Sequence, residues 1–343
     1  MTMTIYEILT KVAGFSYRQR HDGQYGVEIE TESIDSYRIP DMKFWNSDRD
    51  NSLRNFGIEY ILKAPMVYKE IPLALNEFKT FAGKVSFIPD SHSTSVHVHI
   101  NFLNETFLTM ANFFTTWSLI ENLMIKFSGP DRLSNLFCLP IKDAEGVLDT
   151  LKNILQKVQT KDYKRISINN DAVKYGAINP GPFLNLGSIE VRCFRGEMNT
   201  DLQFQWISLL ESIIQYCRTK DLTPKVICDT YKDQGFRILD TIFGSLAPVI
   251  KQRMAPSELT DYLNTNIKYA ARLASVSTRW EKFGIVVQKK VYKQHLKADL
   301  DALASKFNSS DFNTLSYHLQ MVVQEMYETS NPTVRITETE EDI

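Results

Sequence analysis

The sequence has little of what marks secreted, membrane-spanning or nucleic-acid-binding proteins. It has four cysteines in 343 residues and no CxxC pair, which favours free thiols in a reducing compartment and argues against a cysteine-based zinc site. No apolar run of about 18 or more residues is present, so no segment is expected to span a membrane. The 39 basic residues nearly balance 41 acidic ones, whereas nucleic-acid binders usually show a basic excess.

Two further absences narrow the class of protein. The N-terminal segment carries Glu7 and lacks a long apolar core, so it is not expected to be a signal peptide, and we expect a cytoplasmic protein. No GxxxxGK[ST] motif occurs, so any bound ATP is not expected in a P-loop.

What is present is the composition of an ordinary globular protein, with 43% hydrophobic and 23% charged residues. The pattern changes near residue 220: short alternating segments interleave with helices before it, and helical periodicity dominates after it. We therefore predict an α+β domain over 1–220 and a helical region over 221–336. The acidic tail at 337–343 is predicted to be disordered.

Alternation and helical periodicity define the expected elements. Strands are predicted at 25–32, 58–62, 96–102 and 188–194. Helices are predicted at 68–82, 105–127, 143–159 and 201–218, the last starting with a capping box from Thr200 to Gln203. The patterns after residue 220 predict helices at 235–254, 257–280, 286–306 and 311–329.

Three of these strands have an apolar face and an opposite face rich in metal-ligand side chains. The polar faces carry Glu28, Glu30 and Glu32, then His97, His99 and Asn101, then Glu190 and Arg192. Carboxylates with imidazoles on one sheet face suit a hard divalent ion such as Mg²⁺ or Mn²⁺. An arginine beside such ions suits a phosphate group, which accepts bidentate guanidinium contacts.

Each signal has a simpler explanation when taken alone. An E-x-E strand is usually a solvated edge face, H-x-H histidines are often half-buried packing residues, and an E-x-R pair is most often a surface ion pair. The three signals together favour a site. Asp50, expected in a loop, and Glu59, on the next strand, add a second acidic pair, whereas Asp48 reads as a turn residue.

The order of the motifs resembles a known family. Y-G-V-E-I-E, D-x-S-L-R-x-x-G-x-E, H-V-H and G-S-I-E-V-R-C-F-R-G follow one another and precede a helix containing Trp206 and Ile207. This series resembles the amidoligase family of bacteria and phages, from about Gly26 to about Tyr216. Members of that family are similar in fold and metal site to glutamine synthetase and γ-glutamylcysteine ligase. The resemblance implies a curved, mostly antiparallel sheet in a glutamine-synthetase-like domain.

The resemblance also implies roles for single residues. The implied metal ligands are Glu28, Glu30, Asp50, Glu59, Glu190 and His97, with His99 as the alternative histidine near metal and phosphate. Arg192 matches the arginine that contacts the transferring phosphate.

Three further arginines are candidates with weaker support. Arg195 is a second clamp, although strict alternation puts it on the apolar face unless the strand bulges before Gly196. Arg165, in a loop before the last strand, is a candidate for nucleotide or substrate contact. Arg132 is either a residue that reaches the site or an ordinary helix-end arginine.

The implied activity is an ATP- and Mg²⁺-dependent (or Mn²⁺-dependent) carboxylate–amine ligase that acts through an acyl phosphate. The alternatives are a metal-dependent hydrolase and an inactive relative used in binding or assembly. The expected partners are a small-molecule or peptide carboxylate and an amine, with no nucleic acid and no membrane. The substrates' identity, the general base and the oligomeric state are open, and a phage-encoded protein would act in the host cytoplasm.

Overall fold

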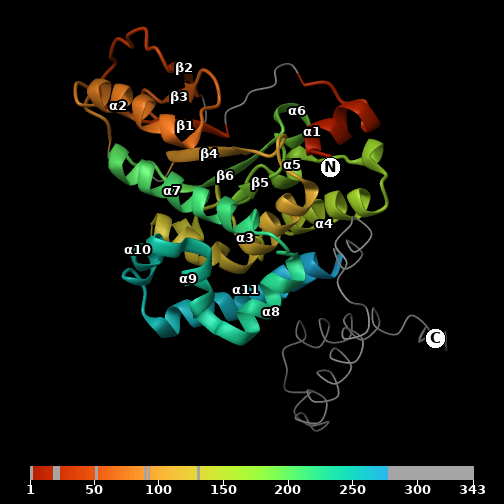
Figure 1. Cartoon of the computed structure of the whole chain (residues 1–343). Helices are drawn as coiled ribbons and strands as arrows, with labels where there is room; N and C mark the ends of the chain where they lie inside the picture. Colours follow the sequence, from red (N-terminus) through yellow and green to blue (C-terminus); the bar gives the residue numbers. More distant parts are fainter. Residues whose placement is uncertain are drawn as a thin grey trace, which may run out of the picture. The chain divides into compact units, whose positions relative to one another are not determined.

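A six-stranded antiparallel sheet organises the protein, which we describe from a computed structural model (Figure 1). The strand order is β2-β3-β1-β4-β6-β5. The four predicted strands are confirmed as β1 (Tyr25–Thr31), β3 (Ile58–Leu62), β4 (Ser95–Asn101) and β6 (Ser188–Arg195). Two short edge strands, β2 (Trp45–Arg49) and β5 (Ile178–Asn179), were not predicted. The α+β class and the antiparallel sheet are therefore confirmed.

The structure describes residues 3–17, 24–50, 53–88, 91, 93–129 and 132–276. These residues belong to one compact unit, Met1–Arg279. The helices predicted at 286–306 and 311–329 and the tail at 337–343 lie outside the described residues, as does the end of the helix predicted at 257–280.

The helices predicted before residue 220 are present. They are α2 (Ile71–Ala82, after a 3₁₀ turn η2 at Tyr68–Glu70), α3 (Phe107–Ser128), α4 (Glu145–Gln159) and α7 (Thr200–Cys217). The cap of α7 differs from the prediction, because the side chain of Asn199 accepts a hydrogen bond from the Asp201 N–H and Gln203 donates to the carbonyl of Glu197. Short pieces complete this half: α1 (Ile5–Glu7), the π-helix η1 (Ile8–Ala13), η3 (Arg132–Ser134), η4 (Tyr163–Arg165), α5 (Asn170–Val173) and α6 (Phe183–Leu186).

The apolar face of the sheet is covered by helices. Val27, Val98 and Val191 on that face are fully or almost fully buried, and α3 and α7 lie beneath the sheet in Figure 1. Trp206 of α7 stacks on Phe194 of β6, with ring centroids 5.0 Å apart. Burial of such large rings contributes strongly to the stability of the core. Because the helices cover the apolar face, the opposite face of the sheet is left for polar groups.

The described part of the region after residue 220 is helical. It contains α8 (Pro224–Gln234), α9 (Ile238–Phe243), α10 (Ala247–Lys251) and α11 (Pro256–Val276), with 3₁₀ turns η5 (Gly235–Arg237) and η6 (Gly244–Leu246). The helix predicted at 235–254 is broken, because Gly244 adopts a positive φ of 52°. Helices α8 and α11 pack against α3, and the division into domains at residue 220 stays a prediction. Within the described ranges no helix has the length and apolar character needed to cross a membrane.

Candidate functional site

The register of the strands brings the predicted carboxylates and imidazoles together. Glu28 of β1 pairs with His97 of β4, and His99 of β4 pairs with Glu190 of β6. On the other side of β1, Glu30 pairs with Glu59 of β3. Residues directly opposite each other in an antiparallel sheet project from the same face. All of these side chains therefore gather on the sheet face opposite α3 and α7.

Glu28 lies at the centre of this group. Its Oε1 is 3.1 Å from His99 Nε2, and its Oε2 is 3.3 Å from His97 Nδ1. His97 Nδ1 is also 3.3 Å from Glu190 Oε1. The other ring nitrogen of His99, Nδ1, lies 3.1 Å from Ser188 Oγ. One carboxylate thus contacts both histidines of the H-x-H motif.

Several carboxylates lie close together in the site, and their charges shift the pKa values of the neighbouring groups. Burial, followed by the charges of Glu28 and Glu30, raises the pKa of Glu59 to about 7. Burial also acts to raise the pKa of Glu28, but its close contacts with the His97 and His99 rings outweigh it and hold that pKa well below its usual value. Burial acts to lower the pKa of His97, yet Glu30 and its other acidic neighbours raise it overall. A positive ion at this face would relieve the repulsion between the carboxylates.

Two overlapping sets of residues have the geometry to hold such ions. They are Glu28, His99 and Glu190, and Glu28, Glu59 and His97, with the ligand atoms of each set within 4.8 Å of one another. His99 Nε2 is buried, and its contact with Glu28 Oε1 at 3.1 Å is not aligned as a hydrogen bond. Carboxylate oxygens combined with imidazole nitrogens fit a divalent cation such as Mg²⁺ or Mn²⁺.

Arg192 lies beside the first of these sets, which contains Glu190. Its guanidinium pairs with Glu190 Oε1, and its Nε is buried without a hydrogen-bond partner among the described residues. Glu190 Oε2 accepts a hydrogen bond of 2.7 Å from Asn179 on the edge strand β5. Glu190 is therefore held from two sides, and Arg192 is held next to the cluster in a position to meet an anion.

Sequence reasoning missed three supporting residues of this face. Asn179 holds Glu190, Ser188 contacts His99, and Ser95 links Glu30 to His97. The only signal for them is position, since Ser188 and Ser95 share strand faces with the predicted ligands. Serine and asparagine carry no pattern that identifies their hydrogen-bond partners.

The acidic residues at the edges of the cluster have different surroundings. Asp50 directly follows β2, and its charge adds to the raised pKa of Glu59, so it lies close to that carboxylate. Glu32 follows the end of β1, where it accepts hydrogen bonds from the Arg54 N–H at 2.7 Å and from Ser91 Oγ at 2.8 Å. Glu32 therefore anchors two loops, while Asp50 borders the cluster.

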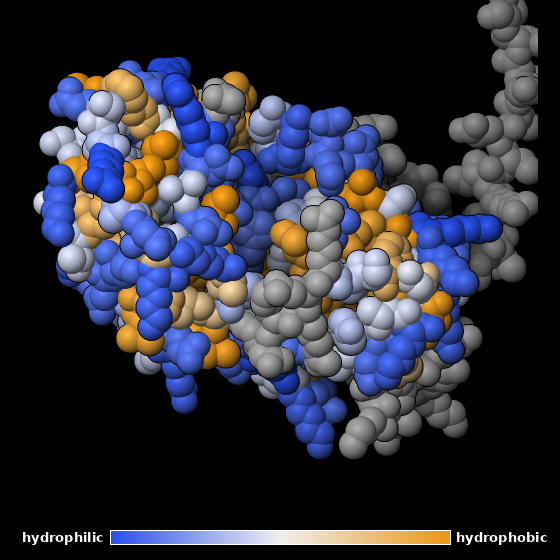
Figure 2. All heavy atoms as spheres, turned by 90° about the horizontal axis from the view of Figure 1, so that it is seen from above, coloured by the Kyte–Doolittle hydropathy of each residue, from blue (hydrophilic) through white to orange (hydrophobic). Residues whose placement is uncertain are grey.

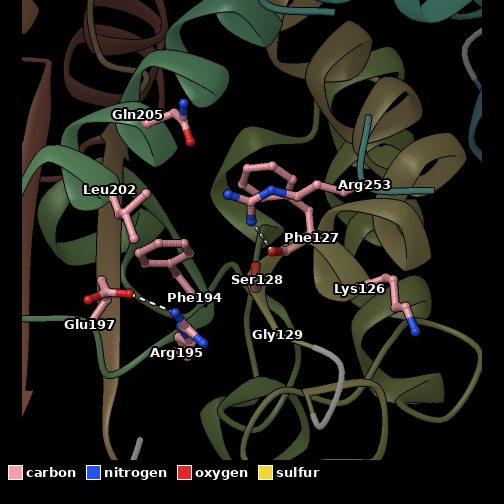
Figure 3. Close-up of a pocket in the computed structure, with 10 residues that line it drawn as sticks. All are labelled: Lys126, Phe127, Ser128, Gly129, Phe194, Arg195, Glu197, Leu202, Gln205 and Arg253. Atoms are coloured by element: carbon pink, nitrogen blue, oxygen red, sulfur yellow. Dashed lines mark hydrogen bonds and ion pairs between the residues drawn. The ribbon is translucent and has the colours of Figure 1, made fainter. Parts of the chain in front are cut away.

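Arg195 is placed by a bulge. The β4–β6 register shifts between Val96 and Val98, so that Arg195 stands opposite Ser95. A side chain at Gly196 would bring its Cβ to 1.9 Å from Thr94 Oγ1, which explains the glycine. The side chain of Arg195 lines a separate pocket of about 280 Å³ and pairs with Glu197 at 2.8 Å (Figure 3). The register shift puts Arg195 opposite Ser95, on the sheet face that carries the histidines, so its role as a second clamp stays a prediction.

The other two candidate arginines lie outside the cluster. Arg132 is buried, and it donates to the carbonyl oxygens of Cys193 at 3.0 Å and Arg192 at 3.3 Å. It therefore supports the backbone of the bulge. Arg165 is exposed and pairs at 3.6 Å with Asp162, the residue just before the 3₁₀ turn η4.

The surface around the sheet is open and polar. Figure 2 views the molecule from the side opposite α3 and shows a hollow at its centre lined with hydrophilic side chains. A second pocket, of about 620 Å³, is lined by residues from the segments 37–42 and 77–85 and lies outside the cluster.

A scan against protein-family models found no match for the sequence, and a search of curated proteins found none either.

Proposed function

We propose that the protein is an ATP- and Mg²⁺-dependent carboxylate–amine ligase of the amidoligase kind, with a glutamine-synthetase-like catalytic domain. The observation that carries the proposal is the position of Glu28, which is shared by two carboxylate–histidine sets while Arg192 is held beside one of them. Two sets of candidate cation ligands and an arginine on one sheet face suit the transfer of a phosphoryl group.

The reaction would proceed in two steps. The substrate carboxylate takes the γ-phosphoryl group of ATP, which releases ADP and forms an acyl phosphate. The amine then attacks the acyl carbon, loses a proton and expels phosphate, leaving an amide. Bound Mg²⁺ would neutralise the charge of the triphosphate.

The chain's own residues have separate tasks in this scheme. Glu28, Glu59 and Glu190, with His97 and His99, would hold the cations. Arg192 would stabilise the equatorial oxygens of the moving phosphoryl group, because its planar guanidinium offers two parallel donors in a fixed orientation. Glu190 would hold that guanidinium in place, and Asn179 in turn would hold Glu190.

A metal-dependent hydrolase is the main alternative, because the same carboxylates and histidines could hold ions that activate water. It gives no specific role to the arginine beside Glu190. An inactive relative that serves in binding or assembly is the other alternative. Loss of one or more metal ligands would be expected in such a relative, whereas every ligand named above is present.

The deciding experiment is an ADP-release assay with Mg²⁺, ATP and pools of carboxylates and amines. The ligase should release ADP in step with amide formation only when an acid and an amine are both supplied. Release of ADP with neither, or hydrolysis of an ester or amide without ATP, would contradict the ligase and favour the hydrolase.

A further inference from the structure

Three buried side chains form a hydrogen-bonded series on the polar sheet face. Ser95 Oγ lies 2.6 Å from Glu30 Oε2 and 2.7 Å from His97 Nε2. All three residues are at most 6% exposed. Because water has little access to the contacting atoms, Ser95 must find its hydrogen-bond donor and acceptor in its two neighbours, Glu30 and His97.

The number of protons fixes the direction of the two hydrogen bonds. An ionised carboxylate only accepts, so the single hydroxyl proton of Ser95 goes to Glu30. The oxygen of Ser95 must then accept from His97, which places a proton on His97 Nε2. The partner of one ring nitrogen determines which nitrogen remains for another ligand.

The remaining nitrogen of His97 faces the carboxylates. Its Nδ1 lies 3.3 Å from Glu28 Oε2 and 3.3 Å from Glu190 Oε1. In a neutral imidazole with its proton on Nε2, the Nδ1 lone pair points at two negatively charged oxygens. That arrangement is repulsive, so Nδ1 needs either a proton, which it would donate to Glu28, or a metal cation that takes the place of that proton.

We infer that Ser95 and Glu30 are positioning residues that hold His97 with its proton on Nε2, so that Nδ1 is the nitrogen offered to a divalent cation shared with Glu28. The inference rests on the metal site of the proposed function. It assigns Glu30 a hydrogen-bonding task through Ser95, whereas the family resemblance implies a metal ligand at this position.

The inference explains why a hydroxyl stands at position 95. Ser95 is two residues before His97 on β4 and therefore projects from the same face. Without the hydroxyl, His97 Nε2 would be buried with no acceptor, and the ring could turn over and offer the other nitrogen. Loss of a group that orients a metal-binding histidine typically lowers metal affinity by about 10- to 100-fold.

The test uses the full-length protein, the variants Ser95→Ala and Ser95→Thr, and two metal probes. Mn²⁺ affinity is measured by electron paramagnetic resonance, and ¹⁵N-histidine NMR of protein loaded with ¹¹³Cd²⁺ identifies the metal-bound nitrogen. We expect cadmium coupling to His97 Nδ1 and a protonated Nε2 in the wild type. Ser95→Ala should lose about 10-fold or more in Mn²⁺ affinity, and Ser95→Thr, which keeps the hydroxyl, should retain most of it.

The outcomes separate this inference from the proposed function. Coupling of cadmium to Nε2, or unchanged Mn²⁺ affinity in Ser95→Ala, overturns the inference even if the ligase is real. If Ser95→Ala does not fold, the coupling in the wild type decides alone. If the wild type binds neither metal, the metal site of the proposed function fails. In that case the exchange of the His97 Nε2 proton tests the hydrogen-bonded series alone. Slow exchange in both the wild type and Ser95→Thr supports the series, and rapid exchange overturns it.

Discussion

Glu121 shows how strongly the interior of this protein disfavours a single charge. Its carboxylate is buried in the middle of α3, where it accepts hydrogen bonds from the Ile141 N–H at 2.6 Å and from Trp117 Nε1 at 3.0 Å. Burial raises its pKa to about 8 although both hydrogen bonds favour the ionised form. Desolvation therefore outweighs two direct contacts, and Glu121 holds the chain after α3 in place as a neutral acid.

The raised pKa of Glu121 predicts a pH-dependent stability. A carboxyl group whose pKa is higher in the folded state than in the unfolded state stabilises the fold fully below its unfolded value, near 4.5, and loses that contribution as the pH rises toward 8. Glu121→Gln keeps the shape but does not titrate. The free energy of unfolding, measured with urea from pH 5 to 8, should fall less with pH in the variant than in the wild type. Parallel pH curves would contradict this.

Arg192 is the residue whose replacement best tests phosphoryl transfer. Arg192→Lys keeps the positive charge and loses the planar pair of donors. ATP turnover should fall by about 100-fold while the nucleotide Kd changes little, because the contact tightens as the phosphoryl group moves. Arg165→Lys is the matched control, since Arg165 is exposed and lies outside the cluster. Equal loss in both variants, or none in either, would remove Arg192 from the mechanism.

At the scale of elements, strand alternation carried most of the information in the sequence. It predicted β1, β3, β4 and β6 and the face on which their ligands lie. It missed β2, in which four of five residues are exposed, and β5, which has only two residues. Such edge strands are fixed by pairing with their neighbours rather than by burial of their own side chains. The β4–β6 bulge also depends on pairing. Alternation alone therefore could not decide on which face of the sheet Arg195 lies.

The close approach of Gly196 to Thr94 at the end of β6 gives a prediction. Gly196→Ala would force its Cβ to 1.9 Å from Thr94 Oγ1, so the strand end must shift. We expect a loss of about 1–3 kcal/mol in the free energy of unfolding, measured by urea denaturation. Gly83→Ala is the control, because its φ of −63° suits alanine and its Cβ would meet only Lys79 O at 3.5 Å. Equal stability in the two variants would show that the end of β6 accommodates a side chain at this position.

At the scale of the whole described unit, α3 connects the sheet to the helices that follow residue 220. It is buried on nearly all sides, packing against β6 and α7 as well as α8 and α11. Its Asn112 donates to the carbonyl oxygens of Cys217 at 3.1 Å and Leu222 at 3.0 Å, on both sides of the predicted boundary. The change in sequence pattern near residue 220 is real, but pattern alone cannot reveal that a helix from the first half is covered by helices from the second.

A buried leucine of α11 can decide whether the described unit unfolds as one body. Leu263 is fully buried, so Leu263→Ala should lower the free energy of unfolding by about 2–5 kcal/mol through lost burial and a cavity. If α11 and the sheet unfold together, the opening free energy measured by hydrogen exchange at the buried amides of β4 should fall by the same amount as that in α11. Leu73→Ala is the control, because Leu73 is 57% exposed and its loss should matter by less than about 0.5 kcal/mol. Faster exchange confined to α8–α11, with β4 unchanged, would instead favour two separately folding domains divided near residue 220.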